Sequence, residues 1–517
     1  MRPLFVSARS CAALLDEAGH YHARERSALY LNGRALGGED RSVVSLYDLK
    51  PDTDYTLVAR RGGVEEAFAF HTAPEVCAMD VRRFGAAGDG VHDDTAALQA
   101  AILCCPAGGR VVIERGDFRT GPLFLKSHIT VEVKGDATLS LLTDRARFPI
   151  LPGMTPANNA AGEVLIGSWE GNPLDSYAAL LNGVGVEDVR LIGEGTLDGR
   201  AQAGDWWLHP KEKVGAYRGR LLFLRDCKAI TVQGLRFRNS PSWNIHPLFS
   251  EDLAFIDIDV QAPADSPNTD GFDPESCRGV RVYGARFSVG DDCVAIKSGK
   301  LYMGRKYRRP SEDIDIAWCA MLDGHGGVTV GSEMAGGVRD VRVRSCLMRG
   351  NDRGLRVKTR RGRGEAGVVD DIRFEDVVME GVKAPLTVNC LYFCDPDGHA
   401  DWVQSRMKRP VDATTPRVGR VAFERVKATD CAACAAYILG LPEQPVEEIA
   451  LKDCDFAFAR DAAPMIPVMA DGVESCLRRG VVAKYVKRLT LEGVRLSGAA
   501  GEALEAEAVE EVHRSAR

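Results

Sequence analysis

Short stretches that alternate apolar and other residues recur along the chain from Ile129 to Leu491. Several continue through Gly or Cys into a second apolar pair, as in ITVQGLRF, VRVYGARF and VRVRSCLM. Stretches that begin at positions 230, 253 and 280 are 23 and 27 residues apart, and longer intervals elsewhere leave room for inserted loops. Because alternation points every second side chain into an interior that one coil cannot bury alone, the repeat predicts an all-β fold, a right-handed parallel β-helix. The apolar pairs that mark the coils are Ile129/Val131, Val189/Leu191, Ile230/Val232, Leu253/Phe255, Val280/Val282, Ile314/Ile316, Val341/Val343, Ile372/Phe374, Val421/Phe423, Ile449/Leu451 and Leu489/Leu491.

A flat β-sandwich is the alternative all-β fold, but its hairpins would place tight turns every ~8–12 residues.

The two ends of the solenoid have their own patterns. Residues 91–105, VHDDTAALQAAILCC, start with Asp and Thr and carry an apolar stripe, which predicts an amphipathic helix that caps the first coil. The charged tail after Ala500 has little to bury, so we expect a helix or a frayed end there.

Residues 1–75 follow a different pattern, with short candidate strands such as ALYL, YTLVARR and EAFAFHT. The string LKPDTDY, which ends at Tyr55, resembles the tyrosine corner of fibronectin type III domains, where the tyrosine hydroxyl returns to the backbone a few residues upstream. We therefore expect a fibronectin type III-like β-sandwich at 1–75 and the β-helix at 76–517. The small domain is expected to buttress the solenoid or wall one end of its cleft, rather than to bind sugar by itself.

Composition narrows the class of partner. A net charge of −7 and a pI near 5.9 argue against nucleic acid or an anionic membrane as the main partner. No secretory signal is visible, because Arg9 and Asp16 interrupt the apolar residues near the start of the chain. We expect a cytoplasmic protein, or a periplasmic or secreted one if the native N-terminus is longer.

Cysteine usage also fits a reducing compartment, since many of the 15 cysteines fall where small buried hydrophobes are expected on strands. Cys431 and Cys434 form a lone CxxC, which is too weak a signal to predict a metal site, and we expect no metal or other cofactor. The cysteines expected on strands include Cys277, Cys293, Cys319, Cys346 and Cys454.

Four short motifs carry the candidate chemistry, and their spacing matches the coil length. Consecutive motifs are 21, 33 and 31 residues apart. If they occupy the same position on successive coils, they stack at roughly 4.8 Å and span on the order of 15 Å, enough for a few sugar rings. The motifs are NTDG with Asn268 and Asp270, DD with Asp291 and Asp292, GHG with His325, and RVK with Arg356 and Lys358.

Three neighbouring carboxylates favour glycoside hydrolysis. That reaction needs one carboxylic acid to protonate the leaving oxygen and one carboxylate to activate water or attack the sugar, and crowding of like charges keeps one group protonated. In a regular strand Asp291 and Asp292 would point to opposite faces, so both can act only at a strand end or bulge. For an inverting reaction we expect a carboxyl separation beyond the ~5.5 Å of retaining pairs.

Positive charge is concentrated around the same motifs. Such a run is often a solvated face, but its coincidence with the carboxylates favours a funnel for an anionic substrate. The basic residues are Lys297, Lys300, Arg305, Lys306, Arg308, Arg309, Arg353, Arg356, Lys358, Arg360, Arg361 and Arg363.

With these motifs in this order, the chain resembles glycoside hydrolase family 28, the polygalacturonase family, over about residues 80–495. The flanking strings LIGEGTLDGRAQAGDWW and FRNSPSWNIHP match as well. The resemblance implies that Asp291 is the general acid, that Asp270 and Asp292 activate water for inversion, and that His325 supports the protonation state of the acid.

The resemblance also implies a substrate-binding set and a substrate, polygalacturonate or oligogalacturonides. Asn268 would orient the substrate or a carboxylate, and Tyr392 in NCLYF would contact the sugar. Arg356 and Lys358 would hold a galacturonate carboxylate, a role that their charge alone would suggest.

An N-terminal fibronectin-like domain before this solenoid resembles the bacterial exo-acting members. Exo action needs a blocked groove, and we expect the extra loops at about 152–178 and 300–312 to block it. Endo action, or a rhamnogalacturonan or xylogalacturonan substrate, is the alternative within the family. A pectate lyase-like enzyme would instead need calcium and a Lys or Arg base, and a non-catalytic glycan-binding solenoid would have no reason to gather three carboxylates beside His325.

Overall fold

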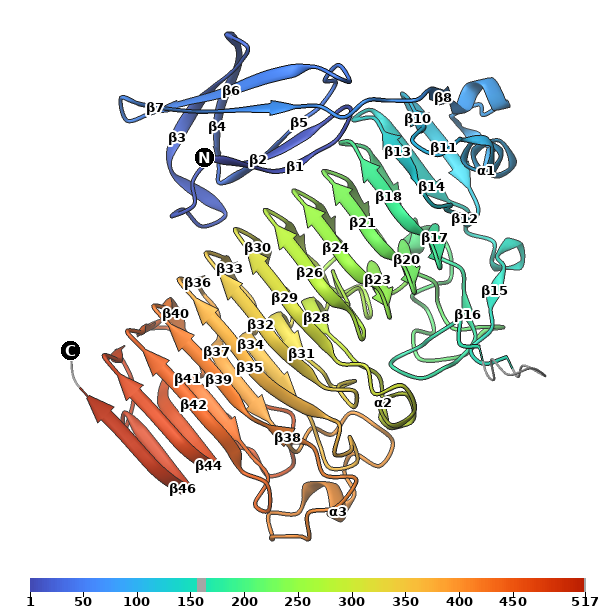
Figure 1. Ribbon diagram of the computed structural model, residues 1–517. Helices are drawn as coiled ribbons and strands as arrows, with labels where there is room; N and C mark the ends of the chain where they lie inside the picture. The colour runs from blue at the N-terminus through green and yellow to red at the C-terminus, as the bar shows by residue number, and fades with distance from the viewer. Residues whose placement is uncertain (156–163, 516–517) are drawn as a thin grey trace.

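The computed structural model describes residues 1–155 and 164–515, so part of the 152–178 loop, residues 156–163, lies outside the described residues. Most of the chain forms a right-handed parallel β-helix, as predicted (Figure 1). A coil contributes one strand to each of three parallel sheets. One such coil consists of β26 (Arg278–Tyr283), β27 (Arg286–Ser288) and β28 (Asp292–Ile296).

The first sheet carries every apolar pair that the sequence singled out. Val280 pairs with Ile314, Ile314 with Val341, and Val341 with Ile372, and all of these side chains are buried. The strands of the first sheet are β8 (Ala78–Asp80), β10 (Arg110–Ile113), β13 (Ile129–Val133), β18 (Glu187–Ile192), β21 (Lys228–Gln233), β24 (Glu251–Ile256), β26, β29 (Ser311–Ala317), β32 (Val338–Arg344), β35 (Val368–Glu375), β39 (Arg420–Glu424), β42 (Val446–Lys452), β44 (Arg479–Glu492) and β46 (Leu504–Ser515).

The second sheet runs beside the first along the solenoid, and its strands are mostly shorter. It consists of β9 (Asp89–Asp93), β11 (Gly116–Thr120), β14 (Ala137–Leu141), β19 (Thr196–Asp198), β22 (Arg236–Arg238), β25 (Asp259–Gln261), β27, β30 (Ala320–Leu322), β33 (Leu347–Arg349), β36 (Val378–Glu380), β40 (Lys427–Cys431), β43 (Asp455–Phe458) and β45 (Arg495–Ser497).

The third sheet carries the chemistry described below. Between β23 and β28 it continues through single bridges at Phe272. Its strands are β12 (Leu123–Phe124), β17 (Leu181–Val184), β20 (Leu222–Arg225), β23 (Ile245–Leu248), β28, β31 (Gly326–Val330), β34 (Arg353–Lys358), β37 (Ala384–Asn389), β41 (Cys434–Leu439) and the first half of β44.

Loops, short helices and short strands lie outside the three sheets. The helix α1 (Thr95–Cys104) covers the first coil as predicted, although residues 91–93 belong to β9 instead of the helix. None of the helices within residues 1–155 and 164–515 is long and apolar enough to cross a membrane. The remaining elements are η1 (Val81–Phe84), η2 (Arg145–Arg147), η3 (Ala201–Ala203), β15 (Ile150–Leu151), β16 (Ser176–Tyr177), β38 (Arg417–Val418), α2 (Leu301–Tyr307) and α3 (Asp401–Gln404).

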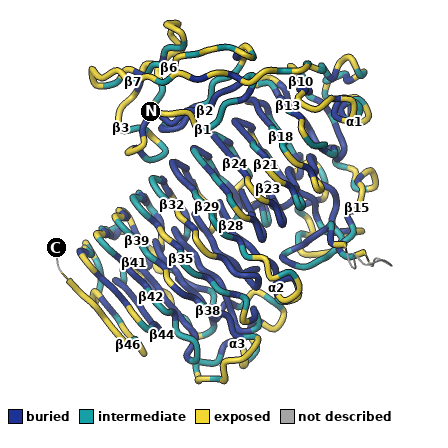
Figure 2. Tube along the Cα trace, in the orientation of Figure 1, coloured by how far each residue is buried: buried dark blue, intermediate teal, exposed yellow. Residues whose placement is uncertain are grey.

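The end of the chain differs from the expectation of a helix or a frayed end. Residues Leu504–Ser515 form β46, which pairs in parallel with β44 and closes the solenoid (Figure 1). The charged tail has little apolar surface to bury, but the unpaired backbone edge of the previous coil provides a ladder of hydrogen bonds. Figure 2 shows that β46 is largely exposed, as an edge strand rich in Glu would be.

The five cysteines expected on strands are all buried, but four of them lie at corners between strands. Only Cys293 lies inside a strand, β28. At the corner between β29 and β30, the thiol of Cys319 donates to the carbonyl oxygens of Ala317 and Val282 at 3.2 and 3.4 Å. A small side chain with a weak donor therefore fills the corner and satisfies the backbone there.

The N-terminal residues form two small antiparallel sheets that fit a fibronectin type III-like domain. The hydroxyl of Tyr55 accepts a hydrogen bond from the backbone N–H of Lys50 at 2.9 Å, as the tyrosine corner predicted. The last of these strands ends at His71 and the solenoid begins at Ala78, so the boundary at residue 75 stays a prediction between them. The two sheets consist of β1 (Arg2–Val6), β2 (Cys11–Leu14) and β5 (Val43–Leu46), and of β4 (Arg34–Arg41), β3 (His22–Leu31), β6 (Asp54–Arg61) and β7 (Val64–His71).

These sheets pack against the outside of the solenoid at its first sheet (Figure 1). Leu14 and Val43 contact Ile256 and Trp318 in one buried apolar cluster. The indole of Trp318 also donates to the carbonyl oxygen of Glu17 at 3.2 Å. This contact supports the expected role as a buttress.

Loss of an interior aromatic side chain should destabilise the stacked coils. Phe374 is fully buried and stacks on Phe423 of the next coil, with ring centroids 5.0 Å apart. We expect Phe374→Ala to lower the free energy of unfolding by about 3–5 kcal/mol, because a cavity remains where the ring was. Chemical denaturation followed by circular dichroism measures this loss. The neighbouring Arg373→Ala, whose half-exposed side chain contacts Asp371, should cost less than about 1 kcal/mol, and equal losses would contradict the expectation.

Candidate active site

Three of the four motifs, NTDG, DD and GHG, lie at the starts of neighbouring strands or bridges in the third sheet, and the RVK motif lies farther along β34. Asp292, Gly326 and Arg353 are the first residues of β28, β31 and β34, and they are direct partners across the three strands. Asp291 and His325 each precede the first residue of their strand by one position. The predicted stacking on successive coils is therefore confirmed for NTDG, DD and GHG, whereas Arg356 pairs with Thr329, three residues farther along the strands.

The two adjacent aspartates diverge because they lie at a strand end, as the sequence required. Asp291 belongs to the turn before β28 and keeps 23% of its side chain exposed. Asp292 begins the strand and is 1% exposed. The pair therefore offers one carboxylate that reaches solvent and one that is buried under the cavity.

Glycines create the space for these carboxylates. A Cβ atom on Gly326 would lie 2.7 Å from Oδ1 of Asp292 and 2.4 Å from Oγ1 of Thr329. A Cβ atom on Gly271 would lie 2.5 Å from the carbonyl oxygen of Cys293. Both distances are shorter than real Cβ contacts, so the glycines of the GHG and NTDG motifs are needed for close approach of the coils.

Two cations hold Asp292 in its charged form. Lys358 Nζ lies 2.9 Å from Oδ2 and Arg356 Nη1 lies 3.4 Å from Oδ1. Burial would raise the pKa of Asp292, but Lys358, Arg356 and then Lys297 hold it below its ordinary value. The ring of Tyr392 lies 5.7 Å from the guanidinium and 5.6 Å from the ammonium, so this residue also reaches the site.

The contact with Asp292 qualifies the role predicted for Arg356 and Lys358. Both side chains share a face, as expected, but both are already engaged by a carboxylate of the protein. Binding of a substrate carboxylate by this pair stays a prediction.

Asp270 has the opposite electrostatic balance. Its carbonyl oxygen accepts hydrogen bonds from the backbone N–H and Nδ2 of Asn244 at 2.8 and 3.0 Å, which fixes the segment between β25 and β28. Its side chain is 3% exposed. Burial and then the charge of Asp291 raise the pKa of Asp270 to about 8, while Lys297 acts to lower it. Because like charges crowd there, Asp270 and Asp291 compete for one proton.

His325 lies at the open side of the cavity. Its backbone N–H donates to the carbonyl oxygen of Asp291 at 3.0 Å, and its Nδ1 lies 3.2 Å from Oδ1 of the same residue. The hydrogen bond and charge of Asp291 raise the pKa of His325. A protonated His325 would stabilise the charged form of Asp291, whereas a general acid needs a proton on Asp291. Support of the acid by His325 therefore stays a prediction.

The three carboxylates are closer together than the sequence analysis expected. One oxygen from each of Asp270, Asp291 and Asp292 lies within 4.8 Å of the others, which is below the expected separation of more than ~5.5 Å. The in-register coils cause this proximity, since they place equivalent positions on adjacent strands at roughly 4.8 Å.

The charge of the three acids is met by side chains of the chain itself. Lys297 faces Asp270, and Arg356 and Lys358 face Asp292, at distances of 2.9–3.8 Å. Within the part of the chain that the structure describes, no group that includes Cys431 or Cys434 brings three metal-binding side chains together.

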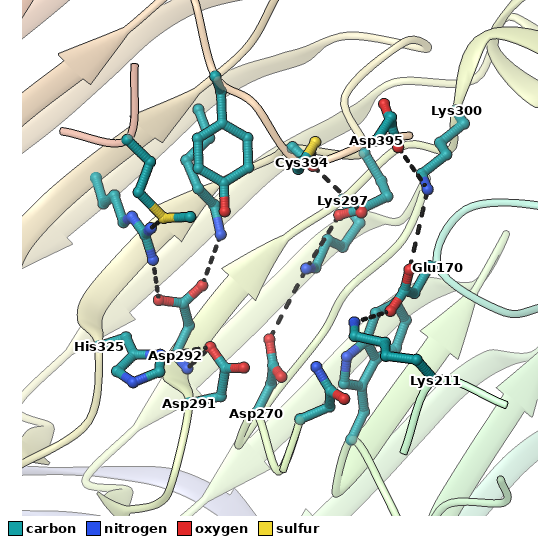
Figure 3. A pocket seen from close by; sticks show the side chains of 18 residues that line it. Glu170, Lys211, Asp270, Asp291, Asp292, Lys297, Lys300, His325, Cys394 and Asp395 are labelled. Atoms are coloured by element: carbon teal, nitrogen blue, oxygen red, sulfur yellow. Dashed lines mark hydrogen bonds and ion pairs between the residues drawn. The ribbon is translucent and has the colours of Figure 1, made fainter. Parts of the chain in front are cut away.

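A cavity of about 280 Å³ opens above the three aspartates (Figure 3). Asn268 also lines it and accepts a hydrogen bond from Arg218 Nη2 at 2.7 Å. All eight residues singled out from the sequence therefore border one cavity. No residue of the N-terminal sheets does so among the described residues, so that domain does not wall this cavity.

One side of the cavity is bordered by an ion-pair wall, which we define as Glu170, Lys211, Lys300 and Asp395. Lys211 Nζ lies 2.5 Å from Glu170, and Lys300 Nζ lies 3.0 Å from Asp395 and 3.9 Å from Glu170. Glu170 belongs to the loop at 152–178 and Lys300 begins the loop at 300–312. In Figure 3 this wall lies on the far side of Asp270 from His325.

The predicted funnel of basic residues is smaller than expected. Of the twelve, only Lys297, Lys300, Arg356 and Lys358 line the cavity. Several others serve the fold: Arg361 pairs with Glu443 at 2.6 Å in a buried contact. Sequence reasoning had no motif that separated the two groups, and it missed cavity residues outside the basic run, namely Glu170, Lys211, Trp243, Ser332, Glu333, Cys394, Asp395 and Met469.

Comparison with known proteins agrees with this geometry. The sequence profile of the glycosyl hydrolases family 28 matches residues 107–465. A probable polygalacturonase of Vitis vinifera is 30% identical over 402 residues, which cover 76% of this chain and 77% of that protein. An endo-polygalacturonase of Pectobacterium carotovorum subsp. carotovorum is 29% identical over 313 residues, which cover 58% of this chain and 72% of that protein.

Among solved structures, an exopolygalacturonase from Thermotoga maritima is similar with a TM-score of 0.63 and 27% identity, covering 82% of this chain and 92% of that one. The four motifs all lie within the region that the family profile covers. The chain therefore belongs to the glycosyl hydrolases family 28, which makes it a glycoside hydrolase related to polygalacturonases.

Proposed function

We propose that this enzyme is an exo-acting polygalacturonase, which hydrolyses α-1,4-galacturonosidic bonds near one end of polygalacturonate or oligogalacturonides with inversion. The observation that carries the exo assignment is the ion-pair wall beside the three aspartates. Its four members come from four loops and bridge them by contacts of 2.5–3.9 Å. A polymer cannot pass through a groove closed in this way, so a chain end must enter.

The proposed division of roles follows exposure and charge. Asp291 is the aspartate with the greatest exposure, so its carboxyl group can reach the glycosidic oxygen and protonate it. Asp270 and Asp292 lie deeper and can hold a water between them. As the C–O bond breaks, the oxygen of this water bonds to the anomeric carbon and its proton passes to the deeper pair.

The separation of the acids alone is that of retaining enzymes, so inversion rests on a different argument. A retaining nucleophile needs a carboxylate oxygen free to bond to the anomeric carbon. Both oxygens of Asp292 are engaged by Lys358 and Arg356, and Asp270 faces Lys297 at 3.8 Å and is crowded by Asp291. Neither is therefore poised to attack, whereas the two together can bind and deprotonate water.

The charge of the cavity favours a uronic acid substrate over a neutral sugar. Lys297, Lys300, Arg356 and Lys358 border a space of about 280 Å³. A lyase would act on the same substrate, but three aspartates within 4.8 Å of one another suit proton transfer to a leaving oxygen and activation of water. Endo action on the same polymer is the second candidate, since the relatives include an endo-polygalacturonase.

The products formed from polygalacturonate distinguish these candidates. We expect mono- or digalacturonate from the first minutes without mid-sized fragments, because only chain ends enter the cavity. Chromatography of end-labelled oligogalacturonides with viscometry follows this course, and a rapid fall in viscosity would contradict exo action. Proton NMR should show the β-anomer in the first-formed product, whereas an α-anomer would indicate retention. Persistence of hydrolysis with chelator, and no unsaturated product, would exclude a calcium-dependent lyase.

Removal of the proposed acid should abolish turnover without unfolding the protein. We expect Asp291→Asn to lower kcat by about 10²–10⁴-fold, because an amide cannot protonate the leaving oxygen. Steady-state kinetics measure the loss, and circular dichroism checks the fold. The exposed Asp265→Asn, on the loop before the NTDG motif, is a matched control that should keep kcat within about twofold. Retention of more than a tenth of the wild-type kcat by Asp291→Asn would refute the assignment.

Binding of the substrate carboxylate by Lys358 must be separated from its contact with Asp292. We therefore compare Asp292→Asn with Asp292→Asn/Lys358→Met, in which no buried aspartate charge is left unpaired. We expect the added substitution to weaken oligogalacturonate binding by about 10–100-fold, the scale of a lost charge-assisted contact. Calorimetry with a methyl-esterified oligomer should give a much smaller loss. Equal losses on both ligands would mean that Lys358 serves the protein alone, and the exposed Lys383→Met, which lies outside the cavity, is the control.

A further inference from the structure

Lys297 occupies a position in the site that the four motifs do not explain. It follows β28 directly and is 4% exposed. Its Nζ lies 3.8 Å from Oδ2 of Asp270, 3.7 Å from Oδ1 of Asp273 and 3.2 Å from Oε2 of Glu333 (Figure 3). The ammonium also lies 4.8 Å from the centre of the Trp243 ring. A buried lysine with this many fixed neighbours has little freedom to move.

The deeper aspartates differ in how their charge is stabilised. Asp292 has two cations of its own, Lys358 and Arg356, at 2.9 and 3.4 Å. Asp270 has only one cation within 4 Å among the described residues, which is Lys297. The ionised state of Asp270 therefore depends on a single lysine.

This dependence matters because the proposed chemistry needs a proton on Asp291 and a charge on Asp270. Burial and the neighbouring Asp291 charge favour the reverse, and they raise the pKa of Asp270 to about 8. Lys297 opposes them, since an ammonium stabilises the carboxylate it faces. The proton shared by two coupled acids belongs to the pair, and a fixed cation beside one member displaces it toward the other.

We propose that Lys297 is a positioning residue that stabilises the charged form of Asp270 and thereby displaces the shared proton toward Asp291. This inference rests on the proposed acid and base roles. In the reaction the proton of Asp291 passes to the glycosidic oxygen and the C–O bond breaks. The oxygen of water then bonds to the anomeric carbon and its proton passes to Asp270. Exchange with solvent restores the starting state.

Glu333 holds Lys297 from the next coil. Burial would raise the pKa of Glu333, but Lys297, Lys300 and Arg363 hold it below its ordinary value, so the carboxylate stays charged. Burial opposes the charge of Lys297 as well, but Glu333 and then Asp270 raise the pKa of the ammonium. Glu333 therefore keeps Lys297 charged. Its own negative charge also partly cancels the stabilisation that Lys297 gives to the Asp270 carboxylate.

Other charged groups lie near Asp270 and Lys297 and also affect the protonation of Asp270. Asp291, Asp292, Asp273, Arg218 and Lys358 also act on Asp270. Burial raises the pKa of Asp273 well above its ordinary value, so this fully buried acid is neutral. A neutral Asp273 does not neutralise Lys297.

Two further groups lie beneath Lys297. Burial, and then Arg220 and Lys297, lower the pKa of His246, which is therefore uncharged. Burial and then Glu333 raise the pKa of Glu275 to about 7, so this acid titrates close to the range of interest. The experiment must therefore assign the titration of Asp270 by its own substitution.

The test compares the pH dependence of kcat/KM in the wild type, Lys297→Met and Lys297→Arg. Activity rises with pH as the base loses its proton, so loss of the cation should move the acidic limb of Lys297→Met upward by about 1–3 pH units. At pH values below this limb, kcat/KM of Lys297→Met should be lower than that of the wild type by about 10-fold or more. Lys297→Arg should restore most of the shift. Lys383→Met, which removes an exposed lysine that pairs with Asp352 outside the cavity, should leave the limb where it is.

Glu333→Gln provides a test of opposite sign if Lys297→Met fails to fold. Loss of the glutamate charge leaves Lys297 to act on Asp270 alone, so the acidic limb should move to lower pH. A lysine with a purely structural role would shift neither limb in these directions. A Lys297→Met enzyme with the acidic limb of the wild type, or a Glu333→Gln limb that moves upward, would overturn the inference.

A direct titration separates this inference from the proposed function. Carbon-13 NMR of labelled aspartate carboxyl groups, with Asp270→Asn to assign the signal, reports the pKa of Asp270 whether or not galacturonan is hydrolysed. We expect Lys297→Met to raise that pKa, and an unchanged value would refute the inference. Absence of galacturonan hydrolysis by the wild type would refute the proposed function alone.

Discussion

The constraint on which this structure depends is the backbone ladder between parallel strands of successive coils. It fixes the distance between equivalent positions at roughly 4.8 Å, whatever side chains they carry. In the interior this spacing stacks Val280 on Ile314 and Phe374 on Phe423, so apolar surface is buried continuously. At the strand starts of the third sheet the same spacing brings acidic residues together, with one oxygen each from Asp270, Asp291 and Asp292 within 4.8 Å. The fold thus places three carboxylates so close together that their negative charges repel one another.

The three carboxylates are stabilised by different numbers of neighbouring cations. An uncompensated buried carboxylate destabilises a protein strongly, and three in contact would be worse. Asp292 has Lys358 and Arg356, Asp270 has only Lys297 in the described structure, and Asp291 reaches solvent beside His325. The three acids are alike in sequence but differ in environment, and such differences in environment are how enzymes assign acid and base roles to identical groups.

The sequence predicted what the ladder determines. All the apolar pairs align, the four motifs meet, and Tyr55 makes its corner contact, because each depends on short-range pattern and a fixed repeat. Contacts between coils and loops were not predictable, since no period relates Glu333 to Lys297 or Glu170 to Lys300. The terminal strand β46 was misjudged because the charged tail has little apolar surface to bury, whereas the unpaired edge of the previous coil decides its structure. The close spacing of the acids was missed because an expectation from reaction class was set above the spacing that the coils impose.

Coils and loops thus contribute different parts of the proposed activity. The coil positions of Asp270, Asp291 and Asp292 cannot change without a shift in the register of the sheet, so the reaction centre is constrained by the fold itself. The ion-pair wall has no such constraint: Glu170, Lys211 and Asp395 lie on long connections between strands, where insertions are tolerated. Loop length can therefore open or close the groove around an unchanged reaction centre. This separation explains how one solenoid with one set of acids can serve either internal cleavage or removal of chain ends.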